Sequence, residues 1–212
     1  MPRFLVVLDV DSTLIENEAI ELLAEAAGSH DRVRDITVRA MAGELDFAQS
    51  LRERVATLAG LPESSFAEAT RRILVTEGVP ELITAIHASG GLVSVVSGGF
   101  HEILDPLAER LGLDGWRANR LEVEGGRLTG RVSGPIVDAA AKAFALREWA
   151  EEARIPLAHT VAIGDGANDL EMMREAGLSV AFDAKPRVRE AADVAMPLRD
   201  LAQVLPLLGL RG

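Results

Sequence analysis

Apolar residues gather in short runs along the chain, and longer segments with helical spacing lie between them. The short runs are rich in Val, Ala and Leu, as in strands buried on both faces, and they occupy residues 4–8, 92–96, 159–163, 179–182 and 193–196. The helical segments cover residues 80–89, 101–111 and 138–153, a stretch beginning at Asn168, and residues 200–208. Because strands that alternate with helices predict a parallel sheet covered on both faces, we expect an α/β protein with a Rossmann-like parallel sheet core.

The stretch after the first strand departs from this rhythm. It is rich in Ala, Leu, Glu and Arg, and its spacing predicts four helices at about 17–27, 31–42, 47–59 and 64–73. Ser65 and Glu68 have the spacing of a capping box for the last of these helices. Further along, residues 119–133 have the pattern of a β-hairpin. We interpret residues 14–75 as a small all-helical cap, inserted into a core made of residues 1–13 and 76–212.

Composition narrows the class of protein. The 212 residues include 33 acidic and 22 basic side chains, for a net charge of −11, which disfavours nucleic acid and anionic membranes as partners. The absence of Cys excludes disulfides, thiolate metal sites and Cys nucleophiles. No apolar run approaches the ~18 residues of a membrane span, and the first residues lack the layout of a signal peptide. We expect a cytoplasmic protein, as a monomer or homodimer.

Polar residues follow several of the predicted strands. Ligands of open parallel sheets bind outside the carboxyl ends of the strands, so these residues are expected near one another. Four carboxylates lie there, and they repel one another unless a cation sits between them: Asp9, Asp11, Asp165 and Asp169. Oxygen ligands without His or Cys select a hard ion, which predicts Mg2+.

The same edge of the sheet is suited to a phosphoryl group. Lys142, early in its helix, offers a positive charge, and Ser97 with the amides of Gly98 and Gly99 can bind phosphate oxygens. The sequence has neither a Cys nor a P-loop. A carboxylate is therefore the expected nucleophile, and the expected intermediate is an aspartyl-phosphate.

These motifs resemble those of a known superfamily. Asp9-x-Asp11-x-Thr13, Ser97, Lys142 and the string 164–169 are similar to the four motifs of the haloacid dehalogenase (HAD) superfamily. The chain resembles the phosphoserine phosphatases within this superfamily over essentially its whole length, most clearly at residues 9–18, 46–55, 96–100, 118–121 and 161–169. The resemblance implies a HAD fold with its cap after the first strand. It also implies Mg2+-dependent hydrolysis of O-phospho-L-serine, the last step of serine biosynthesis.

The resemblance also implies roles for residues of the core. Asp9 would be the nucleophile, and Asp11 would protonate the leaving serine oxygen and then activate water. Mg2+ would be held by Asp9, the backbone carbonyl of Asp11, and Asp165. The phosphoryl group would be bound by Ser97, Gly98 and Lys142, with Asn168 supporting substrate or metal and Asp169 supporting metal or lysine.

In the predicted cap, the resemblance assigns Glu18 to the substrate ammonium and Arg54 to its carboxylate. One acid and one arginine above a phosphate site match the three charged groups of L-phosphoserine. Met41 and Phe47 would form an apolar wall that excludes water. Arg52 is the alternative partner for the substrate carboxylate, but it lies on a different side of the helix from Arg54.

Two other functions share part of this sequence pattern. A related enzyme of the superfamily could hydrolyse or transfer the phosphoryl group of another small, amino-acid-like phosphate ester. A signalling receiver also uses strand-end Asp residues, Mg2+ and a Lys, but the insertion of about 60 residues and Asp11 count against it. The four histidines have no ligand spacing, so we expect no zinc site. The first strand begins at about residue 4, so we also expect no regulatory domain before it.

Overall fold

The core of the protein is one seven-stranded sheet. The computed structural model describes residues 2–210, and the strand order is β4-β3-β2-β1-β5-β6-β7. The strands are β1 (Leu5–Leu8), β2 (Leu92–Phe100), β3 (Gly115–Glu124), β4 (Arg127–Ser133), β5 (Thr160–Gly164), β6 (Leu178–Phe182) and β7 (Val194–Met196). Only β3 and β4 pair antiparallel, as the predicted hairpin, and all other neighbours are parallel. The predicted α/β fold with a mostly parallel sheet is confirmed.

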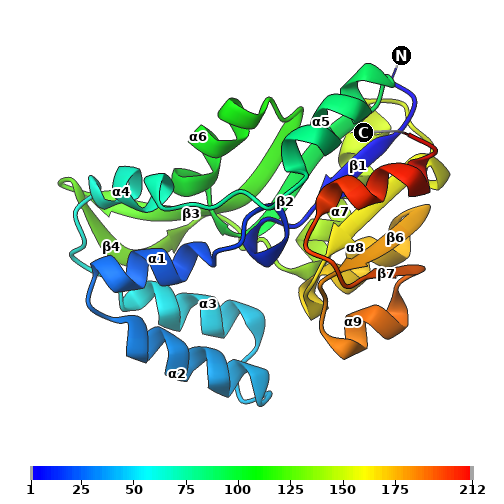
Figure 1. The fold of residues 1–212 in the computed structure, drawn as a ribbon. Helices are drawn as coiled ribbons and strands as arrows, with labels where there is room; N and C mark the ends of the chain where they lie inside the picture. Colours follow the sequence, from blue (N-terminus) through cyan, green and yellow to red (C-terminus); the bar gives the residue numbers. More distant parts are fainter. Residues whose placement is uncertain (1, 211–212) are drawn as a thin grey trace.

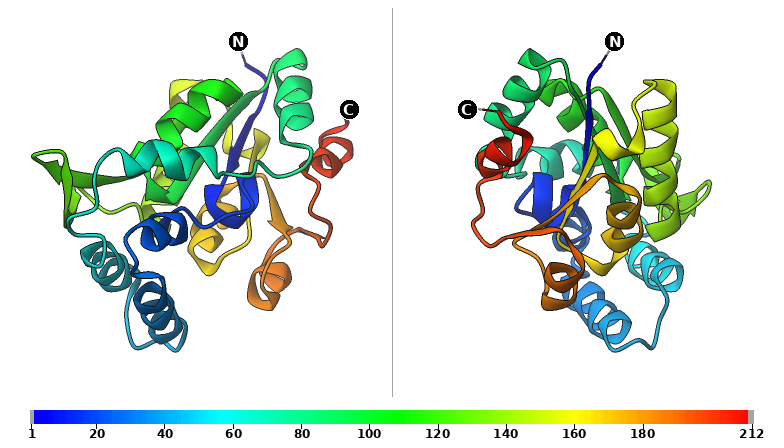
Figure 2. Two further views of the ribbon diagram at one scale, coloured as in Figure 1. Left: turned by 60° about the vertical axis from the view of Figure 1, so that its left-hand side comes forward. Right: turned by 90° about the vertical axis from the view of Figure 1, so that its right-hand side faces the viewer.

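Helices cover both faces of the sheet (Figures 1 and 2). Because successive side chains of a strand point to opposite faces, Val6 and Leu8 of β1 enter one apolar core while Leu5 and Val7 enter the other. The first core is closed by α5 (Val79–Ala88), α6 (His101–Leu111) and the 3-10 helix η4 (Leu201–Leu208). The second is closed by α7 (Ala139–Glu152), α8 (Leu170–Glu175) and α9 (Pro186–Ala191).

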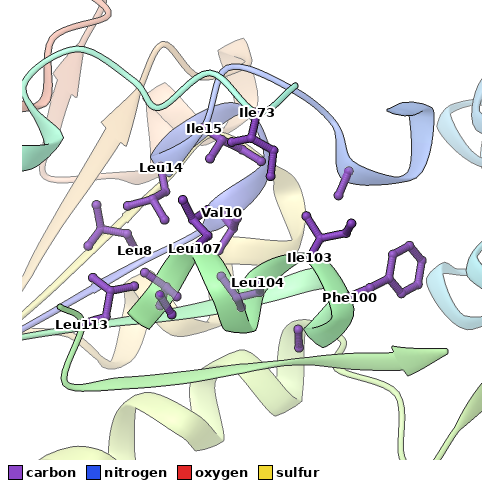
Figure 3. Close-up of a cluster of buried hydrophobic side chains, with 14 of the residues drawn as sticks. Leu8, Val10, Leu14, Ile15, Ile73, Phe100, Ile103, Leu104, Leu107 and Leu113 are labelled. Carbon is purple, nitrogen blue, oxygen red and sulfur yellow. The ribbon is translucent and has the colours of Figure 1, made fainter. Parts of the chain in front are cut away.

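Figure 3 shows part of the first core, where the chain leaves β1. Leu8, Val10 and Leu14 pack against Ile103 and Leu107 of α6. These side chains are at most 4% exposed. Burial of this turn fixes the backbone at the end of β1, where Asp9 and Asp11 lie.

Four helices lie between β1 and α5. They are α1 (Ala19–Ala26), α2 (His30–Met41), α3 (Phe47–Ala56) and α4 (Ser65–Arg71). The first three pack together below the sheet edge, and α4 lies beside α6 (Figure 1). The segment joining α3 to α4 pairs with the hairpin: Gly60 N–H donates to Leu128 O (2.8 Å) and Leu128 N–H donates to Leu61 O (2.9 Å). The helical insertion is thus supported by a β-strand of the core.

Some local predictions were wrong. The capping box expected at Ser65 is absent, because Ser64 already has helical dihedrals and α4 begins without a side-chain cap. A capping box instead begins α3, where Asp46 and Gln49 exchange hydrogen bonds. Helix α9 was not predicted. The segment 200–208 is a 3-10 helix, and a short 3-10 turn at 167–169 precedes α8.

Among residues 2–210, no helix is both long enough and apolar enough to cross a membrane.

Candidate active site

The carboxyl ends of β1, β2 and β5 meet at the centre of the sheet. Asp9 follows β1 directly, and its N–H donates to Ile163 O of β5 (2.9 Å). The next five residues, Val10–Leu14, form an irregular turn, closed by the Ile15 N–H donating to Val10 O (3.0 Å), whose buried apolar side chains hold it against the core. Asp165 follows β5 in the same way, and Ser97 lies within β2, where its pairing with β3 becomes irregular. The fold therefore brings together, at one edge of the sheet, predicted residues that are far apart in the sequence.

Lys142 is the centre of the buried charges. It is fully buried, and its Nζ lies 2.6 Å from Asp9 Oδ1 and 2.7 Å from Asp169 Oδ1. A buried charge is tolerated only when it is paired, and here one cation serves two carboxylates. Burial alone lowers the pKa of Lys142, but attraction to Asp169 and Asp9 outweighs burial and raises the pKa above its ordinary value. Lys142 is therefore a fixed positive charge.

The two carboxylate oxygens of Asp9 differ in their contacts, because Oδ1 is bound by two groups that do not bind Oδ2. Both Lys142 Nζ and the Val10 N–H (2.7 Å) bind its Oδ1. Burial and the nearby Asp169 raise the pKa of Asp9 well above its ordinary value, and Lys142 opposes this shift. Another cation close to Asp9 would favour its ionised form further.

Asp9, Asp165 and Asp169 could hold a divalent metal ion. Each offers a carboxylate oxygen, and these oxygens all lie within 4.8 Å of one another. Burial, with repulsion from Asp169 and Glu18, raises the pKa of Asp165 to about 6. An oxygen-only donor set in which burial raises the pKa of Asp9 and Asp165 fits a hard cation that would stabilise their ionised forms. The side chain of Asp11 is outside this group.

The side chain of Asp11 instead faces the helical insertion. Its Oδ1 accepts a hydrogen bond from the Ala19 N–H (2.9 Å) at the start of α1. Burial and repulsion from Glu18 raise the pKa of Asp11 to about 7, against the opposing pull of Lys142 and Arg54. A carboxyl group with a pKa near neutrality can both give and take a proton, as general acid–base catalysis requires.

The irregular turn within the last part of β2, Ser97–Gly99, has room for an anion because Gly98 and Gly99 have no side chains. The Gly99 N–H donates to Ser97 Oγ (2.8 Å), and a Cβ on Gly99 would lie only 3.0 Å from Asp11 Oδ2 and from Ser97 Oγ. The buried Asn119 holds the turn from behind, since its Nδ2 donates to Gly98 O (2.9 Å) and its Oδ1 accepts from the Val137 N–H (2.8 Å). The sequence motif contained Asn119, but its supporting contacts were not predicted.

A cavity of about 590 Å³ separates this turn from the helical insertion. The core lines it with Asp9, Asp11, Gly98, Gly99, Asp165 and Asn168, and the insertion lines it with Glu18, Met41, Phe47 and Arg54. Ser97 and Lys142 are buried and do not line it. The structure thus gathers around one cavity the predicted residues from both parts of the chain.

Arg54, and not Arg52, points to the cavity. Arg52 is exposed and absent from the cavity wall, whereas Arg54 lies near Glu18, Asp11 and Glu21. Burial lowers the pKa of Arg54, and these three carboxylates oppose that shift. Glu18 is held by Ser12, whose hydroxyl donates to Glu18 Oε1 (2.8 Å). Met41 is 72% exposed at the rim, and Phe47 is partly buried.

Sequence reasoning missed several residues of the cavity wall, among them Glu21, Thr37 and Lys185. Lys185 follows β6 at the carboxyl edge of the sheet. The rule that found Asp9 and Asp165 could have found it, but those residues follow their strands directly, whereas Asp183 and Ala184 separate Lys185 from the end of β6.

Comparison with known proteins places the chain in a family. Residues 6–174 match the family model of haloacid dehalogenase-like hydrolases. Over 201 residues the chain is 49% identical to the phosphoserine phosphatase of Lactococcus lactis, covering 95% of this chain and 93% of that protein. The chain belongs to the phosphoserine phosphatase family of these hydrolases. The resemblance inferred from the sequence motifs is confirmed.

Other members of the phosphoserine phosphatase family agree. The Streptomyces coelicolor phosphoserine phosphatase is 55% identical over 206 residues, which are 97% of this chain and half of that protein. A solved structure described as a phospho-aspartyl intermediate analogue of phosphoserine phosphatase superposes with a TM-score of 0.92 at 44% identity, covering 98% of this chain and 99% of that one. The fold and the strand-end site thus belong to a family in which a phospho-aspartyl analogue has been observed.

Proposed function

We propose that the chain hydrolyses O-phospho-L-serine to L-serine and phosphate through an aspartyl-phosphate on Asp9, as the last step of serine biosynthesis. The observation that carries this proposal is the composition of one cavity wall. It joins the carboxylate of Asp9 and the glycine turn within β2 to one acid and one arginine of the insertion, Glu18 and Arg54. These groups match the phosphate, ammonium and carboxylate of L-phosphoserine.

In the first step, Asp9 Oδ2 attacks phosphorus, because Oδ1 is held by Lys142 and the Val10 N–H. A bond forms between Oδ2 and phosphorus while the bond from phosphorus to the serine oxygen breaks. The carboxyl group of Asp11 gives its proton to that oxygen, which leaves as the serine hydroxyl. The pKa of about 7 lets Asp11 carry this proton near neutral pH.

In the second step, a water molecule attacks the phosphorus of the aspartyl-phosphate. Asp11, now ionised, takes a proton from this water, and the bond from phosphorus to Asp9 breaks. Inorganic phosphate leaves, and Asp11 is protonated again as at the start. The same carboxyl group therefore serves both half-reactions, and atoms and protons balance over the cycle.

The phosphoryl group is bound by Ser97, the amide of Gly98, and Lys142, which also offsets the charge of Asp9. We propose Mg2+ as the metal ion, held by Asp9, the backbone carbonyl of Asp11, and Asp165. When bound, Mg2+ would neutralise charge on the phosphoryl oxygens. Asp169 binds Lys142 and the Gly166 N–H (3.0 Å), so its role is to orient that lysine and turn. Asn168 supports the substrate from the same turn.

Residues 14–75 act as the cap in this proposal. Glu18 pairs with the substrate ammonium and Arg54 with its carboxylate, while Met41 and Phe47 form the wall that keeps water out. Helix α3 presents both Phe47 and Arg54 to the cavity.

Phosphate release from a panel of esters tests this function. The panel contains L-phosphoserine, D-phosphoserine, L-phosphothreonine, phosphoethanolamine, glucose 6-phosphate and p-nitrophenyl phosphate, each with Mg2+ and with EDTA. We expect L-phosphoserine to have the highest kcat/KM, and EDTA to abolish turnover. Preference for another amino-acid-like ester would keep the chemistry and replace the substrate, and no turnover of any ester would refute the function.

Variants separate the roles. We expect Asp9→Asn to lower kcat by about 10⁴-fold or more, since it removes the nucleophile. Arg54→Ala should raise KM for L-phosphoserine by about 10- to 100-fold, because a charged hydrogen-bonded pair is lost. Phosphoethanolamine, which has no carboxylate, should be much less affected by Arg54→Ala. Arg52→Ala is the matched control and should leave both substrates unchanged.

A further inference from the structure

The wall of the proposed active site has more negative than positive side chains. Two cations line the cavity, Arg54 and Lys185, against the five carboxylates of Asp9, Asp11, Glu18, Glu21 and Asp165. The whole chain carries a net charge of −11. A phosphate ester, itself an anion, therefore approaches a wall rich in carboxyl groups, and even with a metal ion between Asp9 and Asp165 an exposed basic side chain there would speed its association.

Three basic residues lie at the site, and Lys142 and Arg54 are less accessible to solvent than Lys185. Lys142 is fully buried between Asp9 and Asp169 and does not line the cavity. Arg54 lies among the carboxylates of the insertion. Lys185 is exposed and forms no salt bridge within 4.0 Å among residues 2–210, but it lies close enough to Asp165 to oppose the rise in the pKa of that carboxyl group. Lys185 is thus the exposed cation of the cavity wall, whereas Arg54 is partly buried.

The backbone of Lys185 is fixed even though its side chain is exposed. Its N–H donates to Asp165 O (3.3 Å), and its carbonyl accepts from the N–H groups of Val188 (2.9 Å) and Arg189 (3.1 Å). It is the residue before α9, and α9 projects from the same sheet edge as α2 and α3 (Figures 1 and 2). Lys185 therefore lies on the core side of the cavity, close to Asp165.

We propose that Lys185 is a positioning residue that draws the phosphate of the substrate into the cavity and turns it toward Ser97 and Gly98. This inference rests on the proposed phosphatase function. Arg54 then remains for the carboxylate at the other end of the same substrate. Because Lys185 acts on encounter and orientation, its loss should change KM and leave kcat nearly unchanged.

Steady-state kinetics of variants with L-phosphoserine and Mg2+ test this proposal. We expect Lys185→Ala to lower kcat/KM by about 3- to 10-fold, Lys185→Glu to lower it further, and Lys185→Arg to restore most of it. Raising the ionic strength should lower kcat/KM of the wild type more steeply than that of Lys185→Ala. The backbone bond to Asp165 O survives all three substitutions, so the turn itself should persist.

Arg187→Ala is the matched control. It removes one positive charge from the same helix, but Arg187 is exposed and does not line the cavity. We expect less than about a 2-fold change in kcat/KM. Binding of inorganic phosphate to the Mg2+-loaded protein, measured by calorimetry, gives a readout that does not depend on turnover. Lys185→Ala should weaken it by a factor similar to that in KM.

Three results would overturn the proposal. One is a fall in kcat at constant KM, which would place Lys185 in the chemical step. The second is an equal effect of Arg187→Ala, which would show a response to net charge alone. The third is unchanged phosphate binding in Lys185→Ala. If the wild type hydrolyses no ester, the proposed function fails, and phosphate binding still decides on Lys185.

Discussion

The protonation and chemical role of single residues at this site depend on the charges around them. Asp9 and Asp11 are two positions apart, yet Asp9 is paired with a buried lysine while Asp11 faces a glutamate and the start of α1. The two carboxyls therefore differ in role, one suited to attack and the other to proton transfer. The sequence motif indicated both residues, but only the folded structure shows that Asp169 shares Lys142 with Asp9.

Gly98 is a point of contact between core and insertion. A Cβ there would lie 2.8 Å from Phe47 Cζ, closer than side chains approach one another. We expect Gly98→Ala to displace the Phe47 ring and to lower kcat/KM by about 5- to 50-fold, as overpacking costs roughly 1–3 kcal/mol.

A double-mutant cycle with Phe47→Ala checks this explanation. Without the ring, the new methyl group has nothing to displace, so Gly98→Ala should have a much smaller effect in the Phe47→Ala background. Equal effects in both backgrounds would show that Gly98 acts through its backbone on the phosphoryl group and not through Phe47.

At the scale of elements, periodicity predicted the strands and long helices, and local capping was harder to predict. Helix α9 has six residues and begins at Pro186, too short for a helical period to be visible. The spacing on α3 showed that Arg52 and Arg54 face different sides, but packing against the core decides which side is inward. Lys185 was missed for a related reason, because the turn that places it is fixed by a backbone bond to Asp165, which no side-chain pattern reports.

The capping box of α3 supports two residues of the cavity wall. Asp46 accepts from the Gln49 N–H (2.7 Å), and α3 presents Phe47 and Arg54. We expect Asp46→Ala to lower the free energy of unfolding by about 0.5–2 kcal/mol and to raise KM more than it lowers kcat. Urea unfolding followed by circular dichroism, together with kinetics, measures both. Ser65→Ala, in α4 where no side-chain cap forms, is the control and should change neither; a similar loss there would contradict the explanation.

At the scale of the whole molecule, the acidic cluster couples stability to pH and metal. In the metal-free folded protein the pKa of Asp165 is about 6 and that of Asp11 about 7, against 3.8 for an ordinary aspartate. The folded state therefore holds protons that the unfolded state releases between about pH 4 and 7. By linkage, the contribution of these groups to stability falls as the pH rises through this window.

We expect the metal-free protein to lose stability from pH 5 to pH 8, and Mg2+ to restore it most at pH 8. At 100 times its dissociation constant, a bound ion adds about 2.7 kcal/mol to the free energy of unfolding. Urea unfolding at both pH values, with EDTA or Mg2+, measures this. Asp165→Asn should shrink both the pH slope and the Mg2+ effect. Equal stabilisation by Mg2+ at pH 5 and pH 8 would contradict the argument.

The position of β1 in the sheet has a consequence for synthesis on the ribosome. This strand is made first but lies in the centre, and its partners are β2 and β5. β5 begins at Thr160, so one edge of this fully apolar strand stays unpaired until β5 has been translated. Such an edge is a template for aggregation while it waits. The arrangement that places Asp9 between the ends of β2 and β5 therefore makes the nascent chain dependent on protection until β5 has been made.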